Sequence, residues 1–148
     1  RQLVDLGFSW YEVSNWAKPN GQCRHNLAYW QNQDWLGIGP GAHGHLSGLR
    51  QWKIKHPAAW AQTLNTGVLP IADQEKLSAP EVKHEDIMLG LRLSSGLALE
   101  VLSERAVREA ELAVTEGLLE ASDFMQGRAV LTLSGRLLAD GLVARLWD

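Results

Sequence analysis

The chain has 148 residues, of which 45% are hydrophobic and 21% are charged, so it can bury a core and is not a disordered tail. Its net charge of −3 gives no general attraction to nucleic acid or to an anionic membrane surface. No apolar run reaches the ~18 residues that would span a bilayer. The chain opens at Arg1 with neither an initiator methionine nor a signal-peptide pattern, so we expect a segment of a longer protein.

Cys23 is the one cysteine of the chain. A disulfide within the chain is therefore impossible, which is consistent with a reducing compartment and a cytoplasmic location. These residues alone also cannot build a cysteine-based zinc or iron–sulfur site.

The first half of the chain is rich in Gly, Asn, His and Trp, and six of the seven tryptophans lie in its first 60 residues. Alternating polarity predicts a strand over Phe8–Ser14, and Asn15–Gln22 is expected to be a loop. The segment His25–Asn32 fits either a short helix or a turn. A buried strand is expected over Trp35–Ile38, followed by a Gly-rich loop over Gly39–Gly44.

Further along, Gln51–Ile54 is compatible with a strand. Pro57–Asn65 is predicted to be a helix, with Pro57 in its first turn and Gly67 past its end. The polar residues 71–80 indicate a boundary, with Pro80 suited to the first turn of the next helix.

The second half is expected to be mainly helical. Helices are predicted over Glu81–Leu93 and over Ser103–Glu116, the second with Ser103 as its N-cap. Two strands, Leu118–Ala121 and Arg128–Thr132, would form a hairpin, and Ser134 would cap a last helix carrying Leu138, Leu142 and Leu146. This order of helix, helix, hairpin and helix is typical of a winged-helix unit. The chain is thus predicted to be α+β, with domains over residues 1–70 and 78–148.

A winged helix raises the possibility of nucleic-acid binding, but the charges argue against it. From Ser103 onward there are five Arg and no Lys against eight Asp and Glu. A phosphate-binding surface needs an excess of basic residues. We therefore expect no nucleic-acid partner.

The densest chemistry lies in Arg24-His25-Asn26-Leu27-Ala28-Tyr29-Trp30. On a helix, His25 and Tyr29 share one face, and Asn26 and Trp30 share another. His25 could then ligate the iron of a porphyrin, with Tyr29 and Trp30 clamping the macrocycle. The alternative is that both aromatic residues belong to the core and that His25 bonds a loop carbonyl.

A second group, Leu36-Gly37-Ile38-Gly39-Pro40-Gly41-Ala42-His43-Gly44, is compatible with a loop that approaches a phosphate or nucleotide, and equally with a tight turn. His43, His45 and His56 lack carboxylate partners at ligand spacing, so no metal site is predicted in this chain.

The residues also resemble a known family. The segment Gly7-Phe8-Ser9-Trp10-Tyr11-Glu12-Val13-Ser14-Asn15-Trp16-Ala17, the H-N-x-x-Y-W motif from His25 to Trp30, and the Gly-Pro-Gly-Ala-His loop ending at His43 resemble HemW-like proteins. Later landmarks are similar too: Met88-Leu89-Gly90-Leu91-Arg92, Glu116-Gly117-Leu118-Leu119 and Leu131-Thr132-Leu133-Ser134-Gly135. These proteins are radical S-adenosylmethionine relatives of oxygen-independent coproporphyrinogen III oxidase.

The resemblance implies a parent protein with a partial TIM barrel, of which residues 1–70 would be the C-terminal part. That barrel would carry S-adenosyl-L-methionine and a [4Fe–4S] cluster, whose cysteine motif would lie upstream of Arg1. Ala42 and His43 would lie near S-adenosylmethionine. Residues 78–148 would be the winged-helix-like C-terminal domain of the family.

The same resemblance implies a function. His25, Asn26, Tyr29 and Trp30 would contact heme, which the protein would deliver to respiratory hemoproteins, with peripheral membrane association through these partners. Two alternatives stay open: oxidative decarboxylation of coproporphyrinogen III in porphyrin biosynthesis, and a non-catalytic protein-interaction module. With one cysteine, this chain by itself is expected to perform no radical chemistry.

Overall fold

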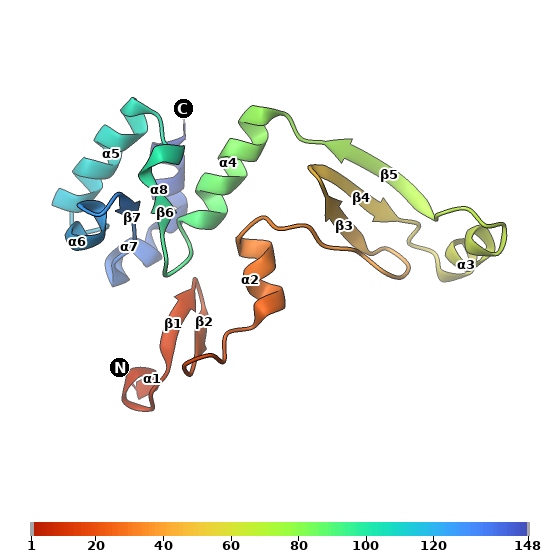
Figure 1. Ribbon diagram of the computed structural model, residues 1–148, viewed down its shortest axis with the longest axis horizontal. Helices are drawn as coiled ribbons and strands as arrows, with labels where there is room; N and C mark the ends of the chain where they lie inside the picture. Colours follow the sequence, from red (N-terminus) through yellow and green to blue (C-terminus); the bar gives the residue numbers. More distant parts are fainter. Residues whose placement is uncertain (1, 148) are drawn as a thin grey trace. The chain divides into compact units, whose positions relative to one another are not determined.

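The computed structural model describes residues 2–147, and the chain divides into two compact units (Figure 1). The core unit comprises the residues up to Asn32 together with those from Lys83 onward, and the sheet unit comprises Gln33–Val82. These units cut across the predicted division at residues 70–78, because the first 32 residues pack with the C-terminal half. The barrel origin of residues 1–70 is a separate question and stays a prediction.

The core unit is built from short strands and helices. Its N-terminal part contains α1 (Gln2–Asp5), β1 (Ser9–Glu12), β2 (Asn15–Ala17) and α2 (Arg24–Trp30). The chain returns to it through α4 (Ala79–Gly90), β6 (Leu97–Ala98), a 3-10 turn (Leu99–Val101), α5 (Glu104–Thr115), α6 (Ala121–Phe124), β7 (Arg128–Ala129), α7 (Leu133–Leu137) and α8 (Ala139–Leu146). The α+β class is confirmed, whereas the winged-helix classification stays a prediction.

The apolar core lies between α4, α5 and α8. The α5 helix turns its alanines inward, so that Ala106, Ala110 and Ala113 are completely buried, and α8 contributes Leu142 and Leu146. Small side chains on α5 allow the two helix backbones to come close together. The predicted α5 helix and its cap are confirmed, since the Ser103 hydroxyl accepts a hydrogen bond from the Ala106 amide at 3.2 Å.

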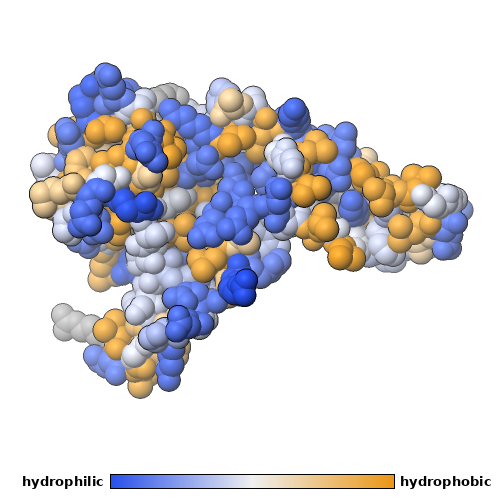
Figure 2. Space-filling model, viewed as in Figure 1, coloured by the Kyte–Doolittle hydropathy of each residue, from blue (hydrophilic) through white to orange (hydrophobic). Residues whose placement is uncertain are grey.

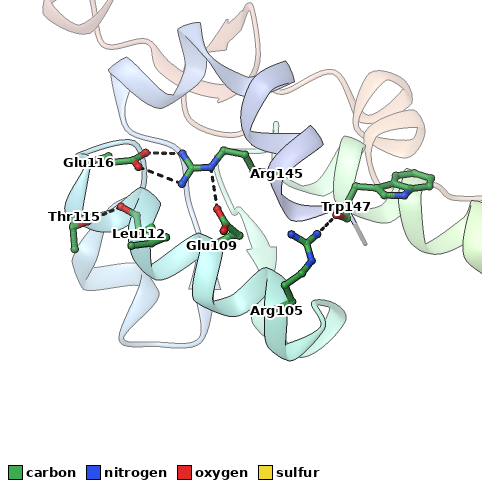
Figure 3. Close-up of polar contacts among 7 residues, drawn as sticks. All are labelled: Arg105, Glu109, Leu112, Thr115, Glu116, Arg145 and Trp147. Atoms are coloured by element: carbon green, nitrogen blue, oxygen red, sulfur yellow. Dashed lines mark hydrogen bonds and ion pairs between the residues drawn. The ribbon is translucent and has the colours of Figure 1, made fainter.

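An ion-pair cluster also joins α5 to α8 (Figure 3). Arg145 donates to both carboxylate oxygens of Glu116, at 2.6 and 3.3 Å, and to Glu109 at 3.3 Å. The hydrogen bond with Glu116 raises the pKa of Arg145. Because these side chains are partly exposed, the two-pronged geometry contributes alignment of the helices more than stability.

The turn into α7 is fixed by a close backbone crossing. A Cβ on Gly135 would lie 2.0 Å from the carbonyl oxygen of Leu118, so only glycine fits. The Thr132 hydroxyl accepts from the Gly135 amide at 3.0 Å and donates to the Gly117 carbonyl at 2.7 Å. Thr132 is therefore the N-cap, and the predicted cap at Ser134 is wrong.

Two further predictions for this region need correction. The expected hairpin is reduced to one bridge, Leu119 to Leu131, because α6 occupies the segment between its strands. The expected last helix divides at Leu138, which has φ −117° and a 57% exposed side chain, so only Leu142 and Leu146 of the predicted leucine face are buried.

A two-stranded hairpin joins the N-terminal residues to the rest of the core unit. Trp10 lies opposite Trp16 across β1 and β2, and the guanidinium of Arg136 lies 4.4 Å and 5.8 Å from their ring centroids. Such cation–π contacts stabilise by about 0.5–2 kcal/mol each. The backbone amide of Ser94 adds a 3.0 Å hydrogen bond to the carbonyl of Tyr11. The loop expected over residues 15–22 therefore begins with a strand.

The sheet unit is an antiparallel sheet in the order β3 (His43–Leu46), β4 (Leu49–Lys53) and β5 (Ile71–Lys76), with α3 (Pro57–Asn65) between β4 and β5 in sequence (Figure 1). The predicted helix at Pro57–Asn65 is confirmed, and the strand expected near Gln51 is present. The polar segment 71–80 contains β5 instead of a linker. Ser78 donates to Glu81 at the start of α4 and thereby lowers the pKa of that exposed carboxylate.

The expected buried strand at Trp35–Ile38 is wrong. Trp35 forms a single bridge with His45, and the side chains of Leu36 and Ile38 are 74% and 87% exposed. The buried hydrophobic residues of the described chain all belong to the core unit. Figure 2 accordingly shows apolar atoms at the surface along β3–β5 and α3. None of the helices between residues 2 and 147 has the length and apolar character of a bilayer span.

Replacing Gly135 by alanine should lower the free energy of unfolding by about 1–3 kcal/mol, because the new methyl group collides with the Leu118 carbonyl. Gly141 in α8 is the matched control, since a Cβ there meets nothing within 4 Å. Gly141→Ala should be neutral or raise stability by up to about 1 kcal/mol. Urea unfolding followed by circular dichroism measures both, and equal effects would contradict the crossing.

Thr132→Val removes the capping hydroxyl at nearly constant volume and should cost about 0.5–2 kcal/mol. Ser134→Ala, two residues along, should change the unfolding free energy by less than about 0.5 kcal/mol, because Ser134 is exposed. The same unfolding measurement decides which residue caps α7; a larger loss for Ser134→Ala would restore the cap expected from the sequence.

Candidate functional site

The short helix α2 presents two different faces. His25 and Tyr29 are exposed and touch each other, with ring centroids 4.7 Å apart at an interplanar angle of 74°. Asn26 and Trp30 are half-buried on another side. The pairing predicted from the four-residue spacing is therefore observed, and the open choice between helix and turn is decided for the helix.

The outward face of α2 leaves the imidazole of His25 exposed. The ring of His25 makes no hydrogen bond with any described residue, so the loop carbonyl considered as its partner is not observed. Its edge-to-face contact with Tyr29 limits the rotation of the imidazole. An exposed imidazole held by a phenol ring can coordinate a metal ion carried by an incoming ligand.

The other face of the helix borders a cavity beside α4. Trp30 lines a cavity of about 260 Å³ together with residues of α4 and of the turn after it. Immediately beyond the helix, Asn32 adopts the left-handed conformation with φ 50°, and its amide donates to Asp86 at 3.2 Å. Tyr29 and Trp30 thus point in different directions, and Tyr29 alone accompanies His25 on the exposed side.

Some polar atoms in this region are buried without a partner. The amide nitrogen of Asn26 and one carboxylate oxygen of Glu12, a residue that is 1% exposed, lack hydrogen bonds in the described residues. Glu12 lies in the segment that resembles the family motif, but no site role was predicted for it from the sequence. The structure therefore adds Glu12 to the residues that sequence reasoning missed.

The Gly-rich loop is shaped by contacts within the chain. A Cβ on Gly37 would lie 1.8 Å from the carbonyl oxygen of His43, so the segment before the loop crosses β3 at backbone distance. The carbonyl of Ala42 accepts a hydrogen bond from the Lys53 amide at 2.9 Å. The backbone amide of Ala42 donates to the Gly39 carbonyl at 3.3 Å. These contacts favour the tight turn over the phosphate loop at this point of the chain.

His43, the next residue, is exposed and stacks on Trp52 directly across the sheet, with centroids 6.0 Å apart. The two rings line a cavity of about 290 Å³, whose wall also includes Trp35 and the ion-paired Arg50 and Glu75. The sequence did not indicate Trp52 as a partner of His43, because the pairing depends on the register of β3 and β4.

The remaining histidines of the sheet unit do not assemble into a metal site. His45 is buried at 7% exposure, and His56 caps α3 by accepting from the Ala59 amide. Among residues 2–147, no group of three His, Cys, Asp or Glu side chains is placed to hold a metal ion. Cys23 is exposed, and a single thiolate does not fit a [4Fe–4S] cluster, which takes several.

The chain is similar in sequence to several known proteins. No family model matches the chain. A Mycobacterium tuberculosis (strain ATCC 25618 / H37Rv) protein named heme chaperone HemW is 47% identical over 145 residues, which are 98% of this chain and 36% of the relative. The heme chaperone HemW of Escherichia coli (strain K12) is 32% identical over 154 residues, covering 95% of this chain and 38% of its own length.

A more distant relative comes from Danio rerio. This protein, named radical S-adenosyl methionine domain-containing protein 1, mitochondrial, is 31% identical over 105 residues, or 66% of this chain and 24% of its own. The chain thus spans little more than a third of the bacterial relatives.

Among solved structures, coproporphyrinogen III oxidase (HemN) from Escherichia coli, described as a radical SAM enzyme, matches with a TM-score of 0.70. The match covers 99% of this chain and 38% of that one at 14% identity, so the likeness concerns the fold alone. Together with the sequence relatives, it places residues 1–148 in a family: the chain belongs to the HemW-like radical S-adenosylmethionine proteins and corresponds to a C-terminal portion of them.

Proposed function

We propose that the protein containing these residues binds heme and delivers it to respiratory hemoproteins, and that the outward face of α2 takes part in binding. The observation that supports this most directly is the position of His25, which is exposed, has no hydrogen bond in the described residues and lies against Tyr29. The relatives named heme chaperone match this part of the chain at 32–47% identity.

His25 would supply a neutral imidazole nitrogen to the heme iron, as histidine does in many hemoproteins. Tyr29 would pack against the edge of the macrocycle through its half-apolar ring. Asn26 and Trp30, which are half-buried on the other side of α2, would contribute indirectly, while Asn32 just beyond the helix bonds Asp86 of α4. An exposed site of this kind suits a cargo that is released again, because little surface of the ligand is enclosed.

The cofactors of the parent protein form the second part of the proposal. The family implies S-adenosyl-L-methionine and a [4Fe–4S] cluster, and the cluster would be held by cysteines outside these residues. Ala42 and His43 would lie near S-adenosylmethionine, where the aromatic cavity beside His43 and Trp52 has a size and lining compatible with a planar base. The C-terminal helices would then form the winged-helix-like domain of the family.

Coproporphyrinogen III decarboxylation is supported here by the fold alone, through a structural neighbour of 14% identity. No arrangement of side chains in the described residues favours it over heme binding. Likewise, no surface of residues 2–147 specifically supports a role as a pure protein-interaction module, although recipient proteins must contact a heme carrier. Peripheral membrane association would follow from such recipients.

Titration of the purified chain with hemin tests the role of His25. His25→Ala should lower the Soret absorption developed per chain, because the imidazole that coordinates the iron is lost. Tyr29→Leu should weaken hemin binding while leaving the position of the Soret maximum unchanged. His56→Asn is the control, since it removes an exposed histidine but keeps an N-cap acceptor. An unchanged spectrum and affinity for His25→Ala would show that α2 does not ligate heme.

Delivery is tested with the whole parent protein loaded with heme and mixed with an apo-cytochrome b. Absorbance should move from the spectrum of the loaded protein to that of the holo-cytochrome, and His25→Ala protein should transfer less heme per mole. Transfer at the rate of free hemin would contradict a chaperone role. Formation of decarboxylated product from coproporphyrinogen III, with cluster and S-adenosylmethionine supplied, would favour the oxidase instead.

A further inference from the structure

The cavity of about 260 Å³ beside α4 carries both an acidic and a basic residue in its wall. Asp86 of α4 and Arg128 of β7 line it, together with the apolar residues Trp30 and Leu93. All of these residues belong to the core unit. His25 is not part of the lining, so the cavity is separate from the exposed face of α2.

Arg128 is held in place by one edge of its guanidinium. Its Nε atom donates to the carbonyl of Ser95 at 2.5 Å, and its Nη2 atom donates to the carbonyl of Gly96 at 2.7 Å. A guanidinium has five N–H donors in a fixed planar fork, so these bonds occupy only two of them. The Nη1 donors make no hydrogen bond with any described residue, which leaves the end of the fork available to pair with a carboxylate.

The turn that presents these two carbonyls requires glycine. Gly96 has φ 66°, in the left-handed region, and a Cβ there would lie 2.4 Å from the carbonyl oxygen of Ala129. Directly after the turn, β6 pairs with β7, and Ala98 lies opposite Arg128. Backbone packing therefore sets both the partners of the guanidinium and the position of the residue that carries it.

Asp86 is the acidic group of the cavity, and it is half-buried. Its Oδ1 atom accepts a hydrogen bond from the side-chain amide of Asn32 at 3.2 Å, and Asn32 also lines the cavity. The other carboxylate oxygen, Oδ2, has no hydrogen bond or ion pair with the residues that the structure describes. A half-buried carboxylate oxygen without a partner favours an ammonium group, which carries three donors.

The two charged groups do not neutralise each other. Asp86 and Arg128 border the same cavity, yet no ion pair joins them within residues 2–147. Each is fixed by neutral neighbours instead, the acid by an amide and the base by two backbone carbonyls. A ligand that satisfies both must therefore carry a positive group and a negative group.

We propose that this cavity binds an α-amino acid with an apolar side chain, its ammonium group on Asp86 and its carboxylate on Arg128. Trp30 and Leu93 would provide the apolar lining for the side chain of the ligand. The volume lies just below the range typical of drug-sized ligands, which suits a molecule as small as an amino acid. This binding is independent of the proposed role of His25 in heme binding.

Three probes separate the two charge contacts: L-phenylalanine, phenethylamine and 3-phenylpropanoate. They share one apolar group, but the second lacks the carboxylate and the third lacks the ammonium group. Isothermal titration calorimetry of the full 148-residue chain measures the binding of each probe. L-Phenylalanine should bind at one equivalent, and both analogues should bind about tenfold more weakly or worse, because each loses one charged hydrogen bond.

Two variants assign the contacts to residues. Asp86→Asn removes the negative charge but keeps an oxygen that can accept from Asn32. It should weaken the binding of L-phenylalanine about tenfold or more without weakening that of 3-phenylpropanoate. Arg128→Gln should likewise weaken L-phenylalanine without weakening phenethylamine. Glu111→Gln and Arg108→Gln make the same changes of charge at exposed positions on α5 and should bind like the wild type.

Circular dichroism establishes that the variants are folded, and the comparison of probes on the wild-type chain does not depend on any variant. Failure of both L-phenylalanine and L-leucine to bind overturns the proposed site. Binding that neither Asp86→Asn nor Arg128→Gln weakens also overturns it, as does an equal loss for all three probes. His25→Ala should retain the binding of L-phenylalanine, so the outcome for heme does not decide the outcome here.

Discussion

The core unit is organised around one backbone crossing, where Gly135 passes the carbonyl of Leu118 at a distance that excludes any side chain. Thr132 holds the crossing by capping α7 and bonding the Gly117 carbonyl. The crossing brings α8 into position over α5, and the apolar core forms between them. Two landmarks that are distant in sequence, Glu116-Gly117-Leu118-Leu119 and Leu131-Thr132-Leu133-Ser134-Gly135, are therefore the two halves of one contact.

A cation–π contact connects the N-terminal residues to this core. The guanidinium of Arg136 lies over the rings of Trp10 and Trp16, and Arg136 belongs to α7, the element that the crossing fixes. The hairpin is followed by α2, and the side chain of Asn32, just after that helix, bonds Asp86 of α4. His25 itself lies on the exposed face of α2.

Local patterns in the sequence were sufficient for the helices with clear start and stop signals. Three such features were predicted correctly: the helix at Pro57–Asn65, the cap at Ser103 and the pairing of His25 with Tyr29. Each depends on residues no more than four apart along a helix, where backbone geometry fixes which side chains are neighbours. Family membership was also readable from short motifs. What the sequence determined is thus the chemistry available and the local elements.

Tertiary structure decided which residues meet. Thr132 caps α7 in place of Ser134, because the Thr132 hydroxyl also donates to the Gly117 carbonyl, a partner 15 residues away. The pairing of His43 with Trp52 depends on the register of β3 and β4. Contacts of this kind depend on how separate elements pack, and no local pattern of residues specifies the packing partner in advance.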